Sequence, residues 1–245
     1  MKPLWYGVRL LLSPFDAVFV AGRRQAERLR AANVPRVVHA AFGVDTSVFR
    51  PSARDQRVRD AWIGEGDRST AVLIGAGRFA VEKRWDVVIE AFARLRARRK
   101  AVLVLYGDGP EREALERSAP HGVIFAGFEK DRHRFAAALA SADALVHAGP
   151  YETFGLSIAE AVACATPVVV PDAGGAAEHA AAGCGRLYPS LDPEACAAAI
   201  EAVLSAPRSD VRAAALDAAS RARTIEQHCR FVVGAYDDLL RDLRR

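Results

Sequence analysis

The chain is poor in cysteine and lysine and has no long apolar run, and each shortage excludes a class of protein. Its 245 residues include four cysteines, which lie far apart without a Cys-x-x-Cys pair. Neither a disulfide framework nor a zinc site is therefore predicted. No run approaches the ~18–20 apolar residues that a membrane helix needs. The apolar stretch 4–15 contains Arg9 and no small-residue cleavage site follows it, so it predicts neither a signal peptide nor an anchor. We expect a cytoplasmic protein.

Composition favours a folded protein and gives little sign of a nucleic-acid partner. Hydrophobic residues make up 51% and charged residues 26% of the chain, which excludes a disordered or collagen-like chain. The net charge is +4, but only four of the 34 cationic residues are lysines. We attribute this arginine excess to genome base composition. The largest basic cluster, at residues 94–100, closes a predicted helix, where cations interact favourably with the helix dipole.

Short apolar runs alternate with helical patterns along the whole chain. The predicted strands are 16–21, 37–41, 71–76, 101–106, 123–126, 144–147, 167–170 and 186–188. Several are apolar at every position, which is typical of parallel strands buried on both faces. Helices are predicted at 85–98, 193–204 and 225–243. The repeated alternation predicts an α/β fold with a doubly wound parallel sheet.

A change in composition after residue 48 divides the chain. The stretch 51–69 contains Pro51, Gly64, Gly66 and a dense mix of charges without a strand pattern, and it is interpreted as a linker. The predicted domains are residues 1–50, the linker 51–69, the main domain 70–222 and a C-terminal helix in 223–245. The N-terminal piece holds two predicted strands, too few to bury a sheet face. Residues 14–41 are therefore expected to be mobile or to pair with a second chain.

Four loops follow predicted strands, at the sheet edge where open parallel sheets bind ligands. In the first loop, Gly75, Gly77 and Ala80 match the dinucleotide-binding pattern G-x-G-x-x-A. That match is a weak signal by itself. It also requires an acidic residue at the end of the next strand, which Asp108 could supply.

The same first loop carries two cations, Arg78 and Lys83. Two cations five residues apart around a glycine turn suit a diphosphate that is held by side chains. In the alternative interpretation, Lys83 pairs with a nearby carboxylate, Glu82 or Asp86.

The second and fourth loops are glycine turns that open helices. In the second loop, Gly107 permits close approach of a ligand and Pro110 suits the first turn of a helix. A purely structural turn is the alternative. The fourth loop, 172–175, contains two glycines and could add backbone donors to a bound anion.

The third loop is the most informative. Glu152 follows a predicted strand, and Glu160 lies eight residues later, two turns into a predicted helix. Between them, the amides of Phe154, Gly155 and Leu156 are first-turn donors that can bind an anion. A carboxylate on either side can accept hydrogen bonds from sugar hydroxyls. Alternatively, Glu152 interacts with the helix dipole and Glu160 is a solvated helix residue, although its alanine-rich surroundings call for a partner.

These motifs together resemble the donor-binding half of glycosyltransferase family 4. The resemblance rests on five segments in order: G-R-F-A-V-E-K (77–83), G-D-G-P-E-R-E (107–113), E-T-F-G-L-S-I-A-E-A (152–161), A-C-A-T-P-V-V-V (163–170) and D-A-G-G-A-A-E (172–178). The family has the GT-B fold, two Rossmann-like domains that face each other across a cleft, and retains anomeric configuration. The segment 42–51 resembles its hinge. The family usually has Asn where Phe42 stands and Gly where Ala165 stands.

The resemblance implies a role for each candidate residue. Arg78 and Lys83 would hold the donor diphosphate and stabilise charge on the leaving nucleoside diphosphate, beside the amides of 154–156. Glu152 would bind the transferred sugar, and Glu160 the ribose. The catalytic residues are then Arg78, Lys83 and Glu152. The donor-binding set also includes Gly77, Gly107, Asp108, Gly127, Phe128, Phe154, Gly155 and Leu156, with the loop 127–130 near the base. No Asp-x-Asp pair is present, so neither a metal nor a cofactor is expected.

Most of the family's N-terminal, acceptor-binding domain is not matched by this chain, in which residues 14–41 resemble the last strand–helix–strand of that domain. The resemblance implies a retaining glycosyltransferase that uses a nucleoside-diphosphate sugar and an unknown acceptor. A lipid-linked acceptor would bring contact with a membrane. The alternative is a non-catalytic nucleotide-sugar-binding subunit that needs a separate acceptor-domain chain or pairs with a second copy through residues 14–41. A nicotinamide-dependent dehydrogenase fits the glycines but leaves Glu152 and Glu160 unexplained.

Overall fold

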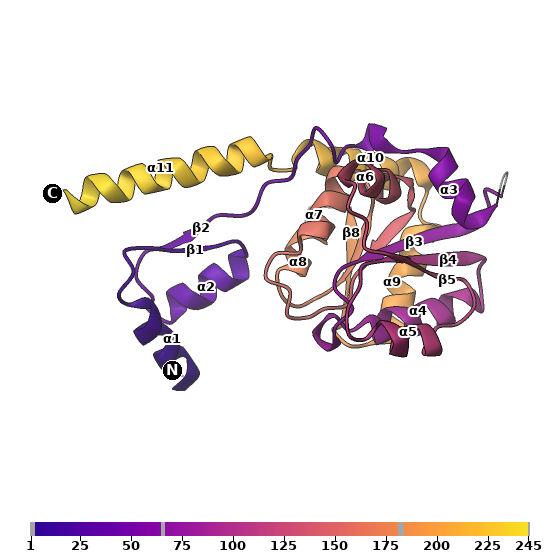
Figure 1. The fold of residues 1–245 in the computed structure, drawn as a ribbon, viewed down its shortest axis with the longest axis horizontal. Helices are drawn as coiled ribbons and strands as arrows, with labels where there is room; N and C mark the ends of the chain where they lie inside the picture. Colours follow the sequence, from indigo (N-terminus) through magenta and orange to yellow (C-terminus); the bar gives the residue numbers. More distant parts are fainter. Residues whose placement is uncertain (1–2, 65–66, 181–183, 245) are drawn as a thin grey trace. The chain divides into compact units, whose positions relative to one another are not determined.

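The computed structural model describes residues 3–64, 67–180 and 184–244, which fall into two units (Figure 1). The larger unit is Val44–Ala222, and the smaller unit is formed by Met1–Gly43 with Arg223–Arg245. Residues 65–66 of the predicted linker and the chain ends 1–2 and 245 lie outside the described residues. No helix among the described residues is long and apolar enough to cross a bilayer.

A parallel sheet forms the centre of the larger unit. Its strands are β3 (Ala71–Ala76), β4 (Ala101–Tyr106), β5 (Val123–Gly127), β6 (Ala144–Val146), β7 (Val168–Pro171) and β8 (Gly185–Tyr188). The spatial order is β5-β4-β3-β6-β7-β8, and every neighbouring pair is parallel. The chain moves outward from β3 in one direction, then returns and moves outward from β6 in the other. The order therefore reverses between β3 and β6, where doubly wound sheets bind ligands.

Helices cover both faces of this sheet, as a doubly wound fold requires (Figure 1). One layer contains α4 (Trp85–Arg96), α5 (Arg112–Ser118) and α9 (Pro193–Ser205). The other contains α3 (Gln56–Ile63), α6 (Arg132–Ser141), α7 (Leu156–Ala163) and α10 (Arg208–Ser220), and the short α8 (Ala176–Ala180) follows β7. Every residue of β3 is buried, which explains why its sequence is continuously apolar rather than alternating.

Local sequence signals set several helix starts. Asp131 accepts hydrogen bonds from the amides of His133 and Arg134 at the start of α6. Asp192 accepts one from the amide of Ala195 at the start of α9, where Pro193 occupies the first turn. Each cap of this kind stabilises a helix by about 0.5–2 kcal/mol.

The segment 51–69, interpreted from sequence as a linker, differs from that expectation. It contains a 3-10 turn at Pro51–Ala53 and helix α3. Arg59 of α3 is 5% exposed and donates to Ser141 O at 3.1 Å and to Asp143 Oδ2 at 2.8 Å. A buried arginine, rather than an apolar stripe, holds this helix on the larger unit, so hydrophobic periodicity does not reveal it. Helix α10 was also not predicted: it lies in the sequence between the two predicted helices, 193–204 and 225–243, that were expected to close the chain.

The smaller unit contains two parallel strands. These are β1 (Val18–Val20) and β2 (Val37–His39), with α1 (Pro3–Leu12), α2 (Arg23–Ala31) and α11 (Ile225–Leu243). Val18 pairs with Val37 in the β1–β2 register. Each strand has three residues, where six and five were predicted. Each also has one strand neighbour among the described residues, so fewer backbone bonds extend it.

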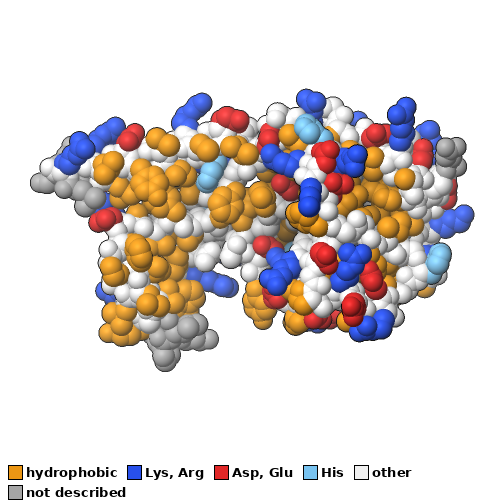
Figure 2. Space-filling model, in the orientation of Figure 1, with side chains coloured by type: hydrophobic (Ala, Val, Ile, Leu, Met, Phe, Trp, Pro, Cys, Tyr) orange, Lys and Arg blue, Asp and Glu red, His pale blue; other side chains and the backbone are white. Residues whose placement is uncertain are grey.

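Helix α11 packs on the strands of the smaller unit. The rings of Phe19 and Tyr236 stack with centroids 5.1 Å apart, and His228 Nδ1 lies 2.9 Å from Ala41 O. A capping box between Thr224 and Gln227 starts this helix. Figure 2 shows many hydrophobic side chains on the visible face of this unit. The exposed large hydrophobic residues of this unit include Tyr6, Leu10, Leu11 and Phe15.

Candidate functional site

The loops after β3 and β6 meet through an ion pair. Lys83 Nζ lies 2.5 Å from Glu152 Oε2, and the two side chains are 24% and 15% exposed. This pair joins two residues that the sequence analysis chose separately as ligand-binding groups. It also corrects the alternative partners proposed for Lys83, because Asp86 pairs instead with Arg84 at 2.7 Å. The pair lies where the strand order reverses, so the topology brings the two loops together.

A buried histidine, which the sequence analysis did not identify, lies behind this ion pair. His147 directly follows β6, and its Nε2 is 3.5 Å from Glu152 Oε2. The Nε2 atom is buried and has no hydrogen-bond partner among the described residues. Burial lowers the pKa of His147 to about 4, although the Glu152 carboxylate opposes this shift. The imidazole is therefore neutral at neutral pH. A histidine that ends an apolar strand is the only sequence signal for it.

Backbone contacts lock the first two glycine loops together. The amide of Gly77 donates to Tyr106 O at 3.0 Å, and the amide of Phe79 donates to Asp108 O at 2.9 Å. Gly107 has φ +140°, and a Cβ atom there would lie 1.9 Å from Gly77 O. Neighbouring backbone therefore explains glycine at position 107. The amide of Gly107 also donates to the carbonyl of Gly127 at 2.9 Å.

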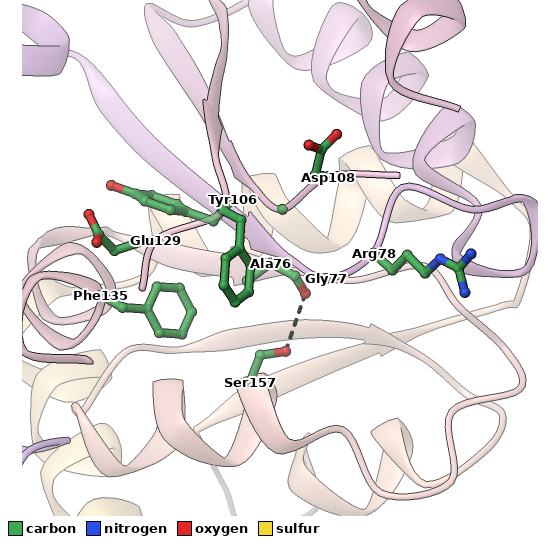
Figure 3. A pocket seen from close by; sticks show the side chains of 10 residues that line it. Ala76, Gly77, Arg78, Tyr106, Asp108, Glu129, Phe135 and Ser157 are labelled. Carbon is green, nitrogen blue, oxygen red and sulfur yellow. Dashed lines mark hydrogen bonds between the residues drawn. The ribbon is translucent and has the colours of Figure 1, made fainter. Parts of the chain in front are cut away.

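A pocket of about 330 Å³ opens at the ends of β3, β4 and β5 (Figure 3). It is lined by Ala76, Gly77, Arg78, Tyr106, Gly107, Asp108, Phe128, Glu129, Phe135 and Ser157. Five of the predicted donor-binding residues are in this lining, and Glu129 belongs to the loop 127–130 that was expected near the base. Ala76, Tyr106, Phe135 and Ser157 were not predicted. The Ser157 hydroxyl donates to Ala76 O at 3.3 Å, which joins α7 to the end of β3. Aromatic walls with a few polar groups suit an organic ring.

Arg78 supplies an uncompensated charge at this pocket. Its side chain is exposed, and its guanidinium makes no ion pair or hydrogen bond with any residue that the structure describes. The backbone of Arg78 is held in place, since its carbonyl accepts a hydrogen bond from Trp85 Nε1 at 2.9 Å. Trp85 is itself 1% exposed. A fixed backbone with a free cationic head suits an anionic ligand.

The fourth glycine loop supports the Glu152 loop. The amide of Gly175 donates to Glu152 O at 2.6 Å. A Cβ atom at Gly175 would lie 2.3 Å from Thr153 O, so glycine is needed for this close approach. The proposal that the loop adds donors to an anion is therefore wrong for Gly175, whose amide is already bonded. The carbonyl of Phe154 is held by His179 Nε2 at 2.7 Å.

Helix α7 begins where the Glu152 loop ends. Gly155 has φ +83°, a left-handed conformation that glycine adopts without strain. The amides of Leu156 and Ser157 have no acceptor inside the helix, whereas the amide of Ile158 donates to Gly155 O at 3.1 Å. Glu160 lies just over one turn into α7 rather than two turns. It also lies one turn after Ser157, on the same side of the helix.

Glu160 is half-buried, and its carboxylate makes no hydrogen bond or ion pair within the described part of the chain. Burial raises the pKa of this carboxyl from 4.5 to about 7, and Arg132 opposes the shift. The partner that its burial calls for is not supplied by the described residues. A ligand with hydroxyl donors would provide one. No group of three or more His, Cys, Asp or Glu side chains within ranges 3–64, 67–180 and 184–244 could hold a metal ion.

Known proteins resemble this chain in sequence. A family model described as glycosyl transferases group 1 matches residues 70–206. The chain is 40% identical over 187 residues to the GDP-mannose-dependent alpha-(1-6)-phosphatidylinositol dimannoside mannosyltransferase of Mycobacterium tuberculosis, which covers 76% of this chain and 47% of that protein. It is 39% identical over 175 residues to a GDP-mannose-dependent alpha-mannosyltransferase of Mycolicibacterium smegmatis, covering 71% and 44%. The chain thus spans about half the length of the curated relatives it matches.

Solved structures resemble it in fold. Sucrose-phosphate synthase from Thermosynechococcus elongatus superimposes with a TM-score of 0.82 at 22% identity, covering 99% of this chain and 63% of that one. HepE from Anabaena in complex with UDP and glucose gives 0.79 at 19% identity, covering 96% and 67%. The fold is therefore the Rossmann-like domain of GT-B proteins with part of the second domain. Because the family model matches more than half of the sequence, the chain belongs to the glycosyl transferases group 1 family.

Proposed function

We propose that this chain binds a nucleoside-diphosphate sugar at the ends of β3 and β6 and transfers the sugar with retention of anomeric configuration. The observation that carries the proposal is the position of two cations. Both cations lie in the loop after β3: Arg78 lines the same pocket as Ser157 of the first turn of α7, and Lys83 pairs with Glu152, which precedes that turn. A diphosphate there would meet two side-chain charges and the amides of 154–156. No metal ion is needed in this arrangement.

The remaining candidate residues then take complementary roles. The Glu152 carboxylate would accept hydrogen bonds from hydroxyls of the transferred sugar, and that of Glu160 from the ribose. Arg78 and Lys83 would stabilise the negative charge that develops on the leaving nucleoside diphosphate. The low exposure of Glu152 and Glu160 supports this proposal, because hydrogen bonds to a carboxylate are stronger where water is excluded.

We propose GDP-mannose as the donor. The pocket offers aromatic rings from Tyr106 and Phe135, with the Glu129 carboxylate beside them. Guanine presents two adjacent N–H donors, and one carboxylate can accept from both. One oxygen of Glu129 already accepts from the amide of Asp131 at 2.9 Å, which holds the carboxylate in place. The names of the mycobacterial relatives, which are GDP-mannose-dependent, support the same donor.

Transfer is preferred over the alternative of a non-catalytic subunit because the relatives are named as transferases. In that alternative, a separate acceptor-domain chain or a second copy, bound through residues 14–41, completes the site. Light scattering would give the mass of the assembly. Release of GDP from GDP-mannose by the purified chain, with and without an added acceptor-domain chain, would separate the two functions.

Calorimetric titration tests the proposed binding directly. GDP, GDP-mannose and UDP-glucose would be titrated into the chain with and without EDTA. We expect binding of GDP and GDP-mannose that EDTA leaves unchanged. Replacement of Arg78 by alanine should weaken both by about 1.5–3 kcal/mol, as expected for a lost charged hydrogen bond. Arg57→Ala, at an exposed arginine of α3, is the control and should bind like the wild type. Strict magnesium dependence would contradict the proposal.

A further inference from the structure

We infer that His147 is a positioning residue, which holds the Glu152 carboxylate in place when Lys83 turns toward the donor diphosphate. The inference rests on the proposed function and adds a residue that the family motifs do not include. It starts from the ion pair at the ends of β3 and β6. In the described structure the Lys83 ammonium and the Glu152 carboxylate form an ion pair with each other, whereas the proposed function requires both side chains to bind the ligand.

The donor would compete with Glu152 for the Lys83 ammonium. An ammonium has three N–H donors, but a diphosphate carries more negative charge than one carboxylate and attracts the ammonium away from it. Glu152 is 15% exposed, so little water replaces the lost contact. A carboxylate that loses its partner in such a place is strongly destabilised. It either moves, which would disturb the bound sugar, or finds another donor.

His147 offers that donor. Its Nε2 lies 3.5 Å from the same Glu152 oxygen that Lys83 contacts. A movement of about half an ångström would bring the two atoms within hydrogen-bond distance. The Nε2 atom is buried and has no hydrogen-bond partner among residues 3–64, 67–180 and 184–244. Because a buried nitrogen is normally hydrogen-bonded, the geometry points to a hydrogen bond from His147 to Glu152 that forms when the ligand draws Lys83 away.

The surroundings fix the ring and leave it little freedom. The edge of Trp85 packs on the imidazole with centroids 6.4 Å apart. A Cβ atom at Gly149 would come within 3.0 Å of His147 Nε2, so the chain passes closely over it. The hydroxyl of Tyr188 donates to the carbonyl of His147 at 2.8 Å. Both ends of the residue are therefore held, which a positioning role requires.

The charged groups near His147 are consistent with a neutral imidazole. Burial disfavours its protonated form most, and Lys83 and His179 add to this, whereas Glu152 and a backbone hydrogen bond with Gly149 favour it. The His147 ring then carries one N–H, which the inference places on Nε2. Exchange of Lys83 for His147 replaces a charged donor with a neutral one.

The test compares two ligands that differ only in the sugar. GDP and GDP-mannose are titrated into the wild type, His147→Phe and His147→Gln. Phenylalanine keeps the ring and removes the donor, whereas the amide of glutamine restores an N–H. For His147→Phe we expect about tenfold weaker binding of GDP-mannose, as for one hydrogen bond to a charged group. GDP should lose less affinity than GDP-mannose, because without a bound sugar the Glu152 side chain is free to move, and His147→Gln should recover most of both losses.

A double-mutant cycle adds a second readout. Glu152→Gln should weaken GDP-mannose binding, and His147→Phe added to it should cause little further loss, because both changes remove the same sugar contact. Equal losses for both ligands would assign His147 a packing role and overturn the inference. The same conclusion follows if neither ligand is affected, or if the two losses simply add.

The unmodified protein provides a measurement that does not depend on the folding of a variant. Nitrogen NMR of imidazole-labelled wild type reports which ring nitrogen of His147 carries the proton. The expected result is a proton on Nε2 whose resonance moves downfield when GDP binds. A proton on Nδ1 in the GDP complex would overturn the inference. If the wild type binds neither GDP nor GDP-mannose, the proposed function fails first.

Discussion

Replacement of Glu160 by glutamine should stabilise the ligand-free protein while weakening its ligand binding. Burial raises the pKa of this carboxyl from 4.5 to about 7 in the folded chain. The folded state therefore binds a proton more tightly than the unfolded state. Stability from this group is fully present below pH 4.5 and is lost as the pH rises to about 7. A difference of about 2.5 between the two pKa values corresponds to about 3 kcal/mol.

Glutamine fills nearly the same space and carries no charge. Glu160→Gln should therefore unfold at higher urea concentration than the wild type at pH 8, by up to about 3 kcal/mol, and the two should converge near pH 4.5. Urea unfolding followed by tryptophan fluorescence at several pH values measures this difference. Glu113→Gln, at an exposed residue of α5, is the control and should change stability little at any pH.

The same substitution should lower affinity. If the Glu160 carboxylate accepts hydrogen bonds from ribose hydroxyls, Glu160→Gln should weaken GDP and GDP-mannose binding by about 1.5–3 kcal/mol each. Wild-type affinity should rise as the pH increases toward 7. The reason is that a larger fraction of the ligand-free protein then already carries Glu160 as a carboxylate, which is the form that accepts the hydrogen bonds. Stability at pH 8 that is unchanged or lower in Glu160→Gln would refute the account of its burial. Unchanged GDP affinity would refute its role at the ribose.

Three further predictions concern the frame around the site. Ala165 has φ +57°, a conformation that costs residues other than glycine about 1–2 kcal/mol. Ala165→Gly should therefore raise the free energy of unfolding by about 0.5–1 kcal/mol. A lower melting temperature in thermal unfolding would contradict this. Arg59→Ala leaves Asp143 without its ion-pair partner and should cost about 3–5 kcal/mol, whereas Arg57→Ala at an exposed site should cost little; equal urea midpoints would contradict the difference. Residues 14–41 should exchange amide hydrogens faster than β7 unless a second chain covers them, and slow exchange in a monomer by light scattering would show that this segment is self-sufficient.

Much of the sheet could be predicted from the sequence because its strands are buried on both faces. The bounds of β3 and β4 were predicted to the residue, since each is a continuous apolar run followed by a glycine loop. Helix α11 was also predicted to the residue. The sequence did not reveal α3, because its main anchor is the buried Arg59 rather than an apolar stripe. The strands β1 and β2 are shorter than predicted because hydrogen-bond partners, not composition, decide where a strand ends.

The sequence by itself identified the loops and the residue types of the candidate site. Arg78, Lys83, Glu152 and Glu160 stand out because charged residues beside glycine turns and helix starts at strand ends indicate an anionic ligand. Only the tertiary structure decided which of these groups meet. Lys83 and Glu152 are 69 residues apart and pair because the sheet order reverses between β3 and β6. The same reversal places His147 Nε2, which has no hydrogen-bond partner in the described part of the chain, behind them. No local pattern specifies a contact between distant strand ends.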